Sequence, residues 1–181
     1  TSLPNVWEDR LSIAADILPD SFCPLCQGLE IAMGNRLYSV DIETGTLSLE
    51  LVAAFGGKGF TSVVDWDLDG DLDILVADWT ELSGIYVWEG QSSEILDTFI
   101  SPNGYIGSRI AVANMDNDIM PECVFKTMTR IYALDNDFSI LWQNPIEENG
   151  GGCGTPATVF DFNGDGIVEV VHRDENSLDV F

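Results

Sequence analysis

The chain is short of basic residues. Its 181 residues include 7 Lys and Arg and a single His against 31 Asp and Glu, which gives a formal net charge of −24. A surface this acidic repels the phosphates of nucleic acids and of anionic membranes. We therefore expect no nucleic acid partner and no binding to anionic membrane surfaces.

The chain also lacks long apolar runs and the common catalytic motifs. No run approaches the roughly 20 apolar residues that a membrane helix needs, so no membrane insertion is expected. A Gly-x-Ser-x-Gly motif, a phosphate loop and a dinucleotide-binding fingerprint are all missing. His172 and Arg173 form the basic pair that invites a catalytic interpretation. Because His172 shares a repeat column with apolar residues, we expect a packed strand histidine and no enzyme activity in this segment.

Acidic residues are abundant, and many lie in short loops. Between Asp65 and Asp73, carboxylates occupy every second position around Gly70. Ca²⁺ takes six to eight oxygens at about 2.3 to 2.6 Å, which alternating side chains and one backbone carbonyl can supply. With Asp65 counted as position 1, an EF-hand would need Glu at position 12. Val76 stands there, so an EF-hand is excluded. The predicted ligands are Asp65, Asp67, Asp69, Asp71 through its carbonyl, and Asp73.

The same loop occurs twice more. The predicted ligands of the next copy are Asn114, Asp116, Asp118, Met120 through its carbonyl, and Glu122. Those of the last copy are Asp161, Asn163, Asp165, Ile167 through its carbonyl, and Glu169. Ile119 stands where the other two loops have glycine at position 6, so we expect two calcium sites and a weaker third. An acidic surface turn that binds no metal is the alternative for each loop.

A degenerate copy of the loop begins at Asp16. Position 1 of successive copies is spaced by 49, 49 and 47 residues, and a regular period of this size indicates a repeat architecture. In this first copy Leu18 occupies position 3, and an insertion with Cys23 and Cys26 precedes the position-9 acid, Glu30. We expect no calcium there, and a local disulfide that fixes the loop instead.

Each unit continues with strand-like segments. Third strands are predicted at residues 35–41, 83–88, 129–135 and 177–181, and fourth strands at 47–51, 94–99 and 138–142. Four short strands per unit at this period are typical of a propeller blade. We therefore predict an all-β, propeller-like array of about four four-stranded blades, the last one incomplete, within a larger propeller. The single repeat domain, 1–181, divides into units of 13–52, 62–100, 110–146 and 157–181.

Aromatic residues recur at fixed places in the units. Tyr38, Tyr86 and Tyr132 fall at one column of the third strands, and Trp66 and Phe162 share position 2 of their loops. Repetition of this kind indicates packing between blades. A platform on which sugars stack is the alternative.

The loop motif supports a family resemblance. The pattern Asp-x-Asp-x-Asp-Gly-x-x-Asp is matched in full by Asp65 to Asp73. Over roughly residues 13 to 181 the chain resembles the FG-GAP/VCBS repeat family, the calcium-bearing blades of integrin α-subunit propellers and of many secreted bacterial proteins. The resemblance implies structural calcium and an extracellular or cell-surface location. It also implies adhesion or ligand binding, with a protein or carbohydrate ligand.

Two other functions stay open. Secreted polysaccharide lyases contain similar repeats, so the chain could be the non-catalytic part of a carbohydrate-active enzyme. It could also be a self-assembling filament subunit in which Thr1 to Trp7 complete the blade of a neighbouring copy. Since Thr1 is not Met and the fourth unit stops after its third strand, we expect an excerpt of a longer chain. Cys123 is expected either to be a core residue or to pair with Cys153.

Overall fold

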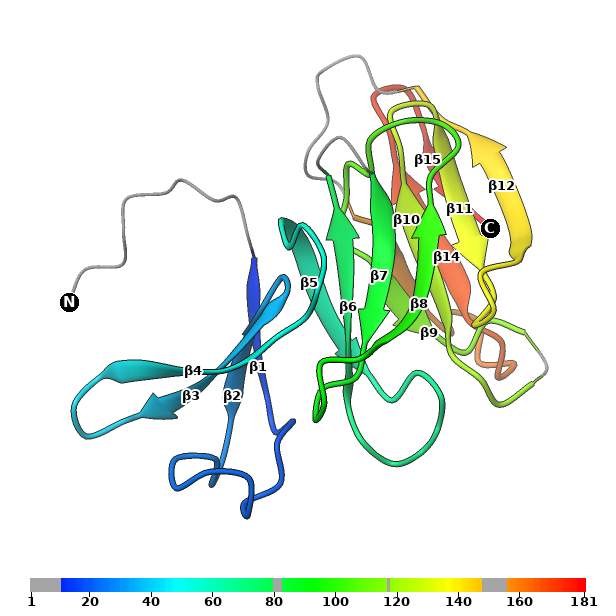
Figure 1. Cartoon of the computed structure of the whole chain (residues 1–181). Coiled ribbons are helices and arrows are strands. Elements are labelled where there is room, and N and C mark those ends of the chain that lie inside the picture. Colours follow the sequence, from blue (N-terminus) through cyan, green and yellow to red (C-terminus); the bar gives the residue numbers. More distant parts are fainter. Residues whose placement is uncertain (1–10, 80–82, 117, 148–155) are drawn as a thin grey trace.

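The computed structural model describes residues 11–79, 83–116, 118–147 and 156–181. These residues form strands and no helix, and the strands make four antiparallel sheets in chain order (Figure 1). The first sheet holds β1 (Ser12–Ala15), β2 (Glu30–Met33), β3 (Arg36–Asp41) and β4 (Thr46–Val52). The second holds β5 (Gly59–Val64), β6 (Asp73–Asp78), β7 (Gly84–Trp88) and β8 (Ile95–Ile100). The third holds β9 (Ala111–Ala113), β10 (Glu122–Lys126), β11 (Arg130–Leu134) and β12 (Ile140–Pro145). The fourth holds β13 (Thr158–Phe160), β14 (Glu169–Arg173) and β15 (Leu178–Val180).

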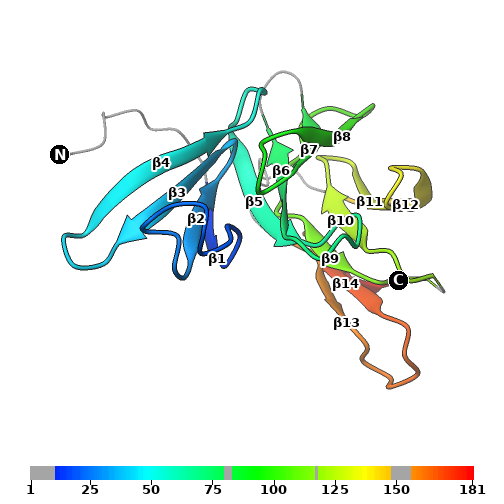
Figure 2. The ribbon, with the colours of Figure 1, turned by 60° about the horizontal axis from the view of Figure 1, so that its bottom comes forward.

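The first strands of neighbouring sheets lie next to one another. Strand β1 contacts β5, and β9 contacts β13. Between the second and third sheets, the Ser62 hydroxyl of β5 donates to the carbonyl of Ile110, just before β9, over 3.0 Å. The sheets form an open array that does not close into a ring, with the first and fourth sheets at opposite ends (Figure 2). Among the described residues no helix is long and apolar enough to cross a membrane.

The two middle sheets are covered on both faces. Every residue of β6 and of β10 is buried. Side chains alternate along a strand, so Ile74 and Val76 join a core with the first sheet, while Leu75 and Ala77 join a core with the third. A further core, which includes Val124, lies between the third and fourth sheets. Burial on both faces accounts for the continuous apolar run from Ile74 to Ala77.

Most predicted strands are confirmed, and one begins later than predicted. The third strands of the four units are β3, β7, β11 and β15, and the fourth strands of the first two units are β4 and β8. Strand β12 starts at Ile140 instead of Phe138. Phe138 has a φ of +62° and donates its N–H to the carbonyl of Asp135 over 2.9 Å, so it belongs to the turn before the strand.

The prediction that the three tyrosines fall at one column is wrong for the first unit. Tyr86 and Tyr132 pair with position 12 of their units, whereas Tyr38 pairs with Ile31 at position 10. The β2–β3 hairpin turns within two residues after Met33, which shortens it relative to the others. A shift of two residues keeps the side chain on the same face of the sheet. All three rings are buried, which favours packing between sheets over a sugar-stacking platform.

Candidate metal centres

One hydrogen bond recurs at every loop between the first and second strands. The carboxylate at position 9 accepts the backbone N–H of position 2. The pairs are Ile17 to Glu30, Trp66 to Asp73, Met115 to Glu122, and Phe162 to Glu169. Because this acid is the first residue of the second strand in each unit, the bond ties the start of the loop to the sheet. The loop geometry therefore repeats with the sequence period.

The three acidic loops share a second set of hydrogen bonds. In each loop the side chain at position 3 accepts the N–H of position 5, and the side chain at position 5 accepts the N–H of position 7, over 2.7 to 3.2 Å. Asp and Asn make such local turns readily because their short side chains reach the backbone two residues on. These bonds fix the peptide N–H groups of the three predicted carbonyl ligands, Asp71, Met120 and Ile167.

In the second unit, three carboxylates converge. One oxygen each of Asp65, Asp67 and Asp73 lies within 4.8 Å of the others. Asp73 is 1% exposed. Burial and the nearby charges of Glu89 and Asp67 raise its pKa to about 7, although the hydrogen bond from Trp66 lowers it. The Asp69 carboxylate does not join this group of three and instead accepts the N–H of Asp71 over 2.9 Å.

Two carboxylate oxygens of this group are buried without a hydrogen bond. They are Oδ1 of Asp65 and Oδ1 of Asp73. A buried carboxylate oxygen that accepts no hydrogen bond is costly, and a cation can compensate it. Since the donors are all oxygen, the residues fit a hard cation such as Ca²⁺ better than a soft one.

The fourth unit gathers the predicted residues in a more exposed loop. Oxygens of Asp161, Asp165 and Glu169 lie within 4.8 Å of one another, and Asn163 donates its side-chain amide to Glu169 over 2.7 Å. Asp161 accepts the N–H of Gly166 at position 6 over 2.9 Å. Gly166 has a φ of +91°, and the matching Gly70 of the second unit has a φ of +102°. Glycine adopts such angles without steric cost, which explains the residue at position 6.

The third unit brings together a different set. Oxygens of Asp116 and Glu122 lie within 4.8 Å of each other and of Asp135, which follows β11 and was not predicted. Asp118 does not join this group of three. Asn114 donates its side-chain amide to the carbonyl of Asp118 over 2.5 Å. Ile119 at position 6 does not take the positive φ of the two glycines.

The sequence did contain a signal for Asp135. An acid stands three residues after each tyrosine of the third strands, as Asp41, Glu89 and Asp135. Burial raises the pKa of Glu89, and the nearby charges of Asp69, Asp67 and Asp71 raise it further. Glu89 therefore also faces a loop. Asp135 lies outside the loop motif, so the motif alone does not identify it.

The first unit departs from the other three. Asp16 is exposed, and Leu18 at position 3 is 1% exposed. No group of three acidic side chains in the described part of the chain includes Asp16 or Glu30. Oε1 of Glu30 is buried without a hydrogen bond, as in the acidic loops. A single buried oxygen is therefore not enough to identify a site, and the convergence of several carboxylates is the discriminating feature.

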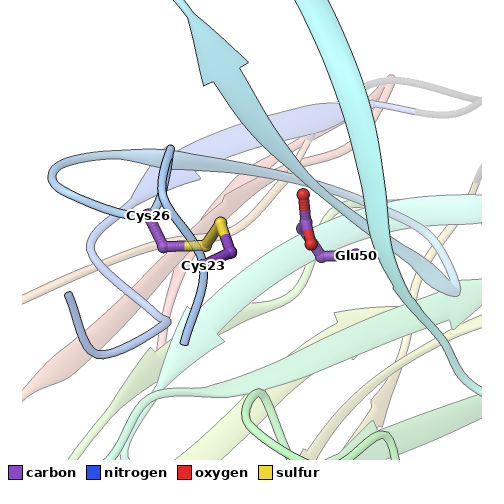
Figure 3. A group of neighbouring side chains, drawn as sticks. All are labelled: Cys23, Cys26 and Glu50. Atoms are coloured by element: carbon purple, nitrogen blue, oxygen red, sulfur yellow. A yellow bond between two sulfur atoms is a disulfide. The ribbon is translucent and has the colours of Figure 1, made fainter. Parts of the chain in front are cut away.

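The predicted disulfide closes the first loop. Cys23 and Cys26 are bonded, with their Cα atoms 5.1 Å apart. Glu50 of β4 lies beside them (Figure 3). Because both sulfurs are used in the disulfide, this trio offers no thiolate to a metal.

Two further predicted residues lie in the core. His172 in β14 is 1% exposed, as expected for a packed strand histidine. Cys123 is a free, fully buried cysteine, and burial raises the pKa of its thiol. Cys153, its predicted alternative partner, lies outside the described residues.

Comparison with solved structures gives a slight structural likeness. No protein-family model matches the chain, and no curated protein matches it. Among solved structures, the V. cholerae biofilm matrix protein Bap1 is similar with a TM-score of 0.48 and 20% sequence identity. The match covers 80% of this chain and 21% of that one, so the chain spans about a fifth of the length of that protein.

Proposed function

We propose that this chain is an extracellular, calcium-stabilised array of FG-GAP/VCBS-type β-propeller blades. The observation that carries the proposal is the convergence of Asp65, Asp67 and Asp73 around buried carboxylate oxygens without hydrogen bonds. Two carboxylates about 5 Å apart repel by roughly 3 kcal/mol at an effective dielectric of 20. A divalent cation would turn this repulsion into attraction and hold the loop. The role of the ion is therefore structural.

Location and role follow from the same features. The disulfide between Cys23 and Cys26 fits an oxidising compartment. Weak oxygen-ligand loops are saturated at the millimolar calcium found outside cells. The loop carboxylates are committed to the ion, and His172 is buried, so we infer binding or adhesion without catalysis. The partner would be a protein or carbohydrate at the cell surface. The contacts between first strands of neighbouring sheets support the blade-like arrangement.

Calcium titration and unfolding test this function. Isothermal titration calorimetry should find oxygen-ligand sites that prefer Ca²⁺ over Mg²⁺, because Mg²⁺ demands a smaller octahedral cage. At a calcium concentration of 100 times the Kd, each site should add about 2.7 kcal/mol to the free energy of unfolding. Asp65→Asn combined with Asp161→Asn should remove most of this gain. Equal unfolding midpoints in calcium and in EGTA would contradict a structural role.

An exposed apolar face favours association as a second function. On the fourth sheet Phe160, Leu178 and Val180 are 63%, 67% and 62% exposed, while Val159 and Val170 pack toward the third sheet. An exposed face of this kind fits a further sheet, from a longer chain or from a second copy. Multi-angle light scattering in calcium should then show a mass that rises with concentration. A constant monomer mass would contradict self-association. Thr1 to Trp7, the predicted donor segment, lies outside the described residues.

A further inference from the structure

The third loop keeps a three-carboxylate group although it lacks two features of the motif. Position 1 is Asn114 instead of Asp, and position 6 is Ile119 instead of Gly. The second and fourth units each gather three carboxylates from within their loops. In the third unit the loop contributes Asp116 and Glu122, and the third member is Asp135, which directly follows β11.

Strand register explains why Asp135 reaches the loop. Cys123 of β10 pairs with Leu134 of β11, so the next residues, Glu122 and Asp135, stand opposite each other on one face. The side chain of Asp135 is anchored by accepting the N–H of Asn136 over 2.7 Å with Oδ1. The second carboxylate oxygen remains available to a ligand.

The equivalent residues of the first two units do not join a group of three carboxylates. Glu89 stands opposite Asp73, and its charge contributes to the raised pKa of Asp73. However, Glu89 does not belong to the group of three carboxylates in its unit. In the first unit Ser39 stands opposite Glu30, and its hydroxyl donates to Glu50 over 2.6 Å.

An unsatisfied buried oxygen points independently to a ligand. Glu122 is fully buried, and its Oε2 accepts the N–H of Met115. Its Oε1 is buried without a hydrogen bond, beside the carboxylates of Asp116 and Asp135. Three carboxylates with an uncompensated buried oxygen form an environment that favours a cation over any neutral group.

We propose that Asp135 is a cation ligand of the third loop and supplies, from the end of β11, the carboxylate that position 1 lacks. The proposal rests on the proposed calcium function. With Asp135 included, each of the three sites contains three converging carboxylates. Because calcium affinity follows the charge and number of ligands, the third site binds calcium in the same range as the other two. The weaker binding predicted from Ile119 alone is then offset.

Residue-resolved titration of the whole chain tests the proposal. The backbone amides of Gly70, Ile119 and Gly166, all at position 6, report on the three loops separately in ¹H–¹⁵N spectra. Asp135→Asn should raise the calcium midpoint at Ile119 by at least about tenfold. The midpoints at Gly70 and Gly166 should stay within about twofold, because distant sites behave independently. Glu89→Gln is the matched control: it should leave the Ile119 and Gly166 midpoints within about twofold, and it should move the Gly70 midpoint less than Asp135→Asn moves the Ile119 midpoint.

Two further variants separate ligation from folding. Asp135→Ser places at this position the residue that the first unit has there, and it should weaken the Ile119 midpoint as Asp135→Asn does. Adding Asn114→Asp to Asp135→Asn returns a carboxylate at position 1 and should restore most of the affinity. An unchanged Ile119 midpoint in both Asp135 variants would overturn the proposal. Calcium-independent spectra of the unaltered chain at all three amides would instead refute the calcium function itself.

Discussion

The loops of the first and second units solve the same structural problem in different ways. Both connect a first strand to a second strand, and both end at a buried acid that accepts the N–H of position 2. In the first loop Ile17 and Leu18 are buried, and the disulfide closes the insertion. In the second loop Asp65 and Asp67 turn toward Asp73 instead.

The two loops share one hydrogen bond and differ in what else stabilises them. The hydrogen bond from position 2 to position 9 needs one carboxylate oxygen, and both loops have it. The remaining stabilisation comes from apolar burial and a covalent bond in one loop, and would come from a bound ion in the other. The first loop should therefore be indifferent to calcium, whereas the second should depend on it.

The largest expected effect comes from removing the position-9 acid. Glu30→Ala leaves the N–H groups of Ile17 and Leu18 buried without acceptors, which should cost about 3 kcal/mol of unfolding free energy in calcium and in EGTA alike. Asp73→Ala should cost about 4 kcal/mol in calcium, since it removes a site and a hydrogen bond. In EGTA the same change should cost about 1 kcal/mol or less, because it also removes a desolvated charge.

Urea unfolding of the two variants measures this difference directly. Glu30→Gln is the control, because its side-chain oxygen can still accept the two N–H groups while the charge is lost. It should be much milder than Glu30→Ala. A calcium-dependent cost for Glu30→Ala would show that the first loop also holds an ion, and the contrast between the loops would fail.

Breaking the disulfide should have an intermediate effect. Replacing Cys23 and Cys26 with Ser opens a short covalent loop, which should cost about 2 kcal/mol. The cost should be the same in calcium and in EGTA, since no predicted ligand lies in the insertion. Thermal unfolding of the variant and of the unaltered chain, each with and without EGTA, gives the four values needed. A cost that doubles in EGTA would show that the two loops are coupled.

Because the pKa of Asp73 is raised, stability should change with pH in opposite directions with and without calcium. Its pKa is about 7 in the folded chain, against an ordinary value near 4 when unfolded. Between these values the folded chain binds more protons, so without calcium stability should fall, by a few kcal/mol at most, as pH rises from about 4 to about 7. With calcium the ion competes with the proton, so stability should rise over the same interval.

The pH experiment needs only urea midpoints across this interval in EGTA and in calcium. Asp73→Asn cannot titrate and should flatten the decline seen in EGTA. The same sign of slope in both conditions for the unaltered chain would contradict ion binding by Asp73.

The sequence predicted features that depend on neighbouring residues. The alternation of acids from Asp65 to Asp73, the glycine at position 6 and the short Cys23–Cys26 spacing each have a local physical reason. The sequence did not predict features that depend on how strands pair. Asp135 reaches its loop only through the pairing of β10 with β11. The shift of Tyr38 comes from a shorter hairpin. Closure of the sheets into a propeller remains a prediction.

A small expected effect concerns the backbone of the second loop. Leu68 at position 4 has a φ of +60°, and the same position of the fourth unit is Gly164 with a φ of +79°. A left-handed conformation costs a residue with a side chain about 1 to 2 kcal/mol, whereas glycine adopts it freely but loses more chain entropy on folding. Leu68→Gly should therefore stabilise the chain in calcium by about 0.5 kcal/mol.

Leu68→Gly tests whether a side chain or the ion determines the conformation of the second loop. In the first unit the buried Leu18 is part of the support, so its truncation should destabilise the chain by about 3 kcal/mol. Leu68 is 43% exposed, and if ligands hold the second loop its side chain is dispensable. Gly164→Ala is the reverse control and should cost about 1 kcal/mol. Urea unfolding in calcium measures all three. A loss of stability for Leu68→Gly would mean that the second loop, like the first, depends on an apolar side chain.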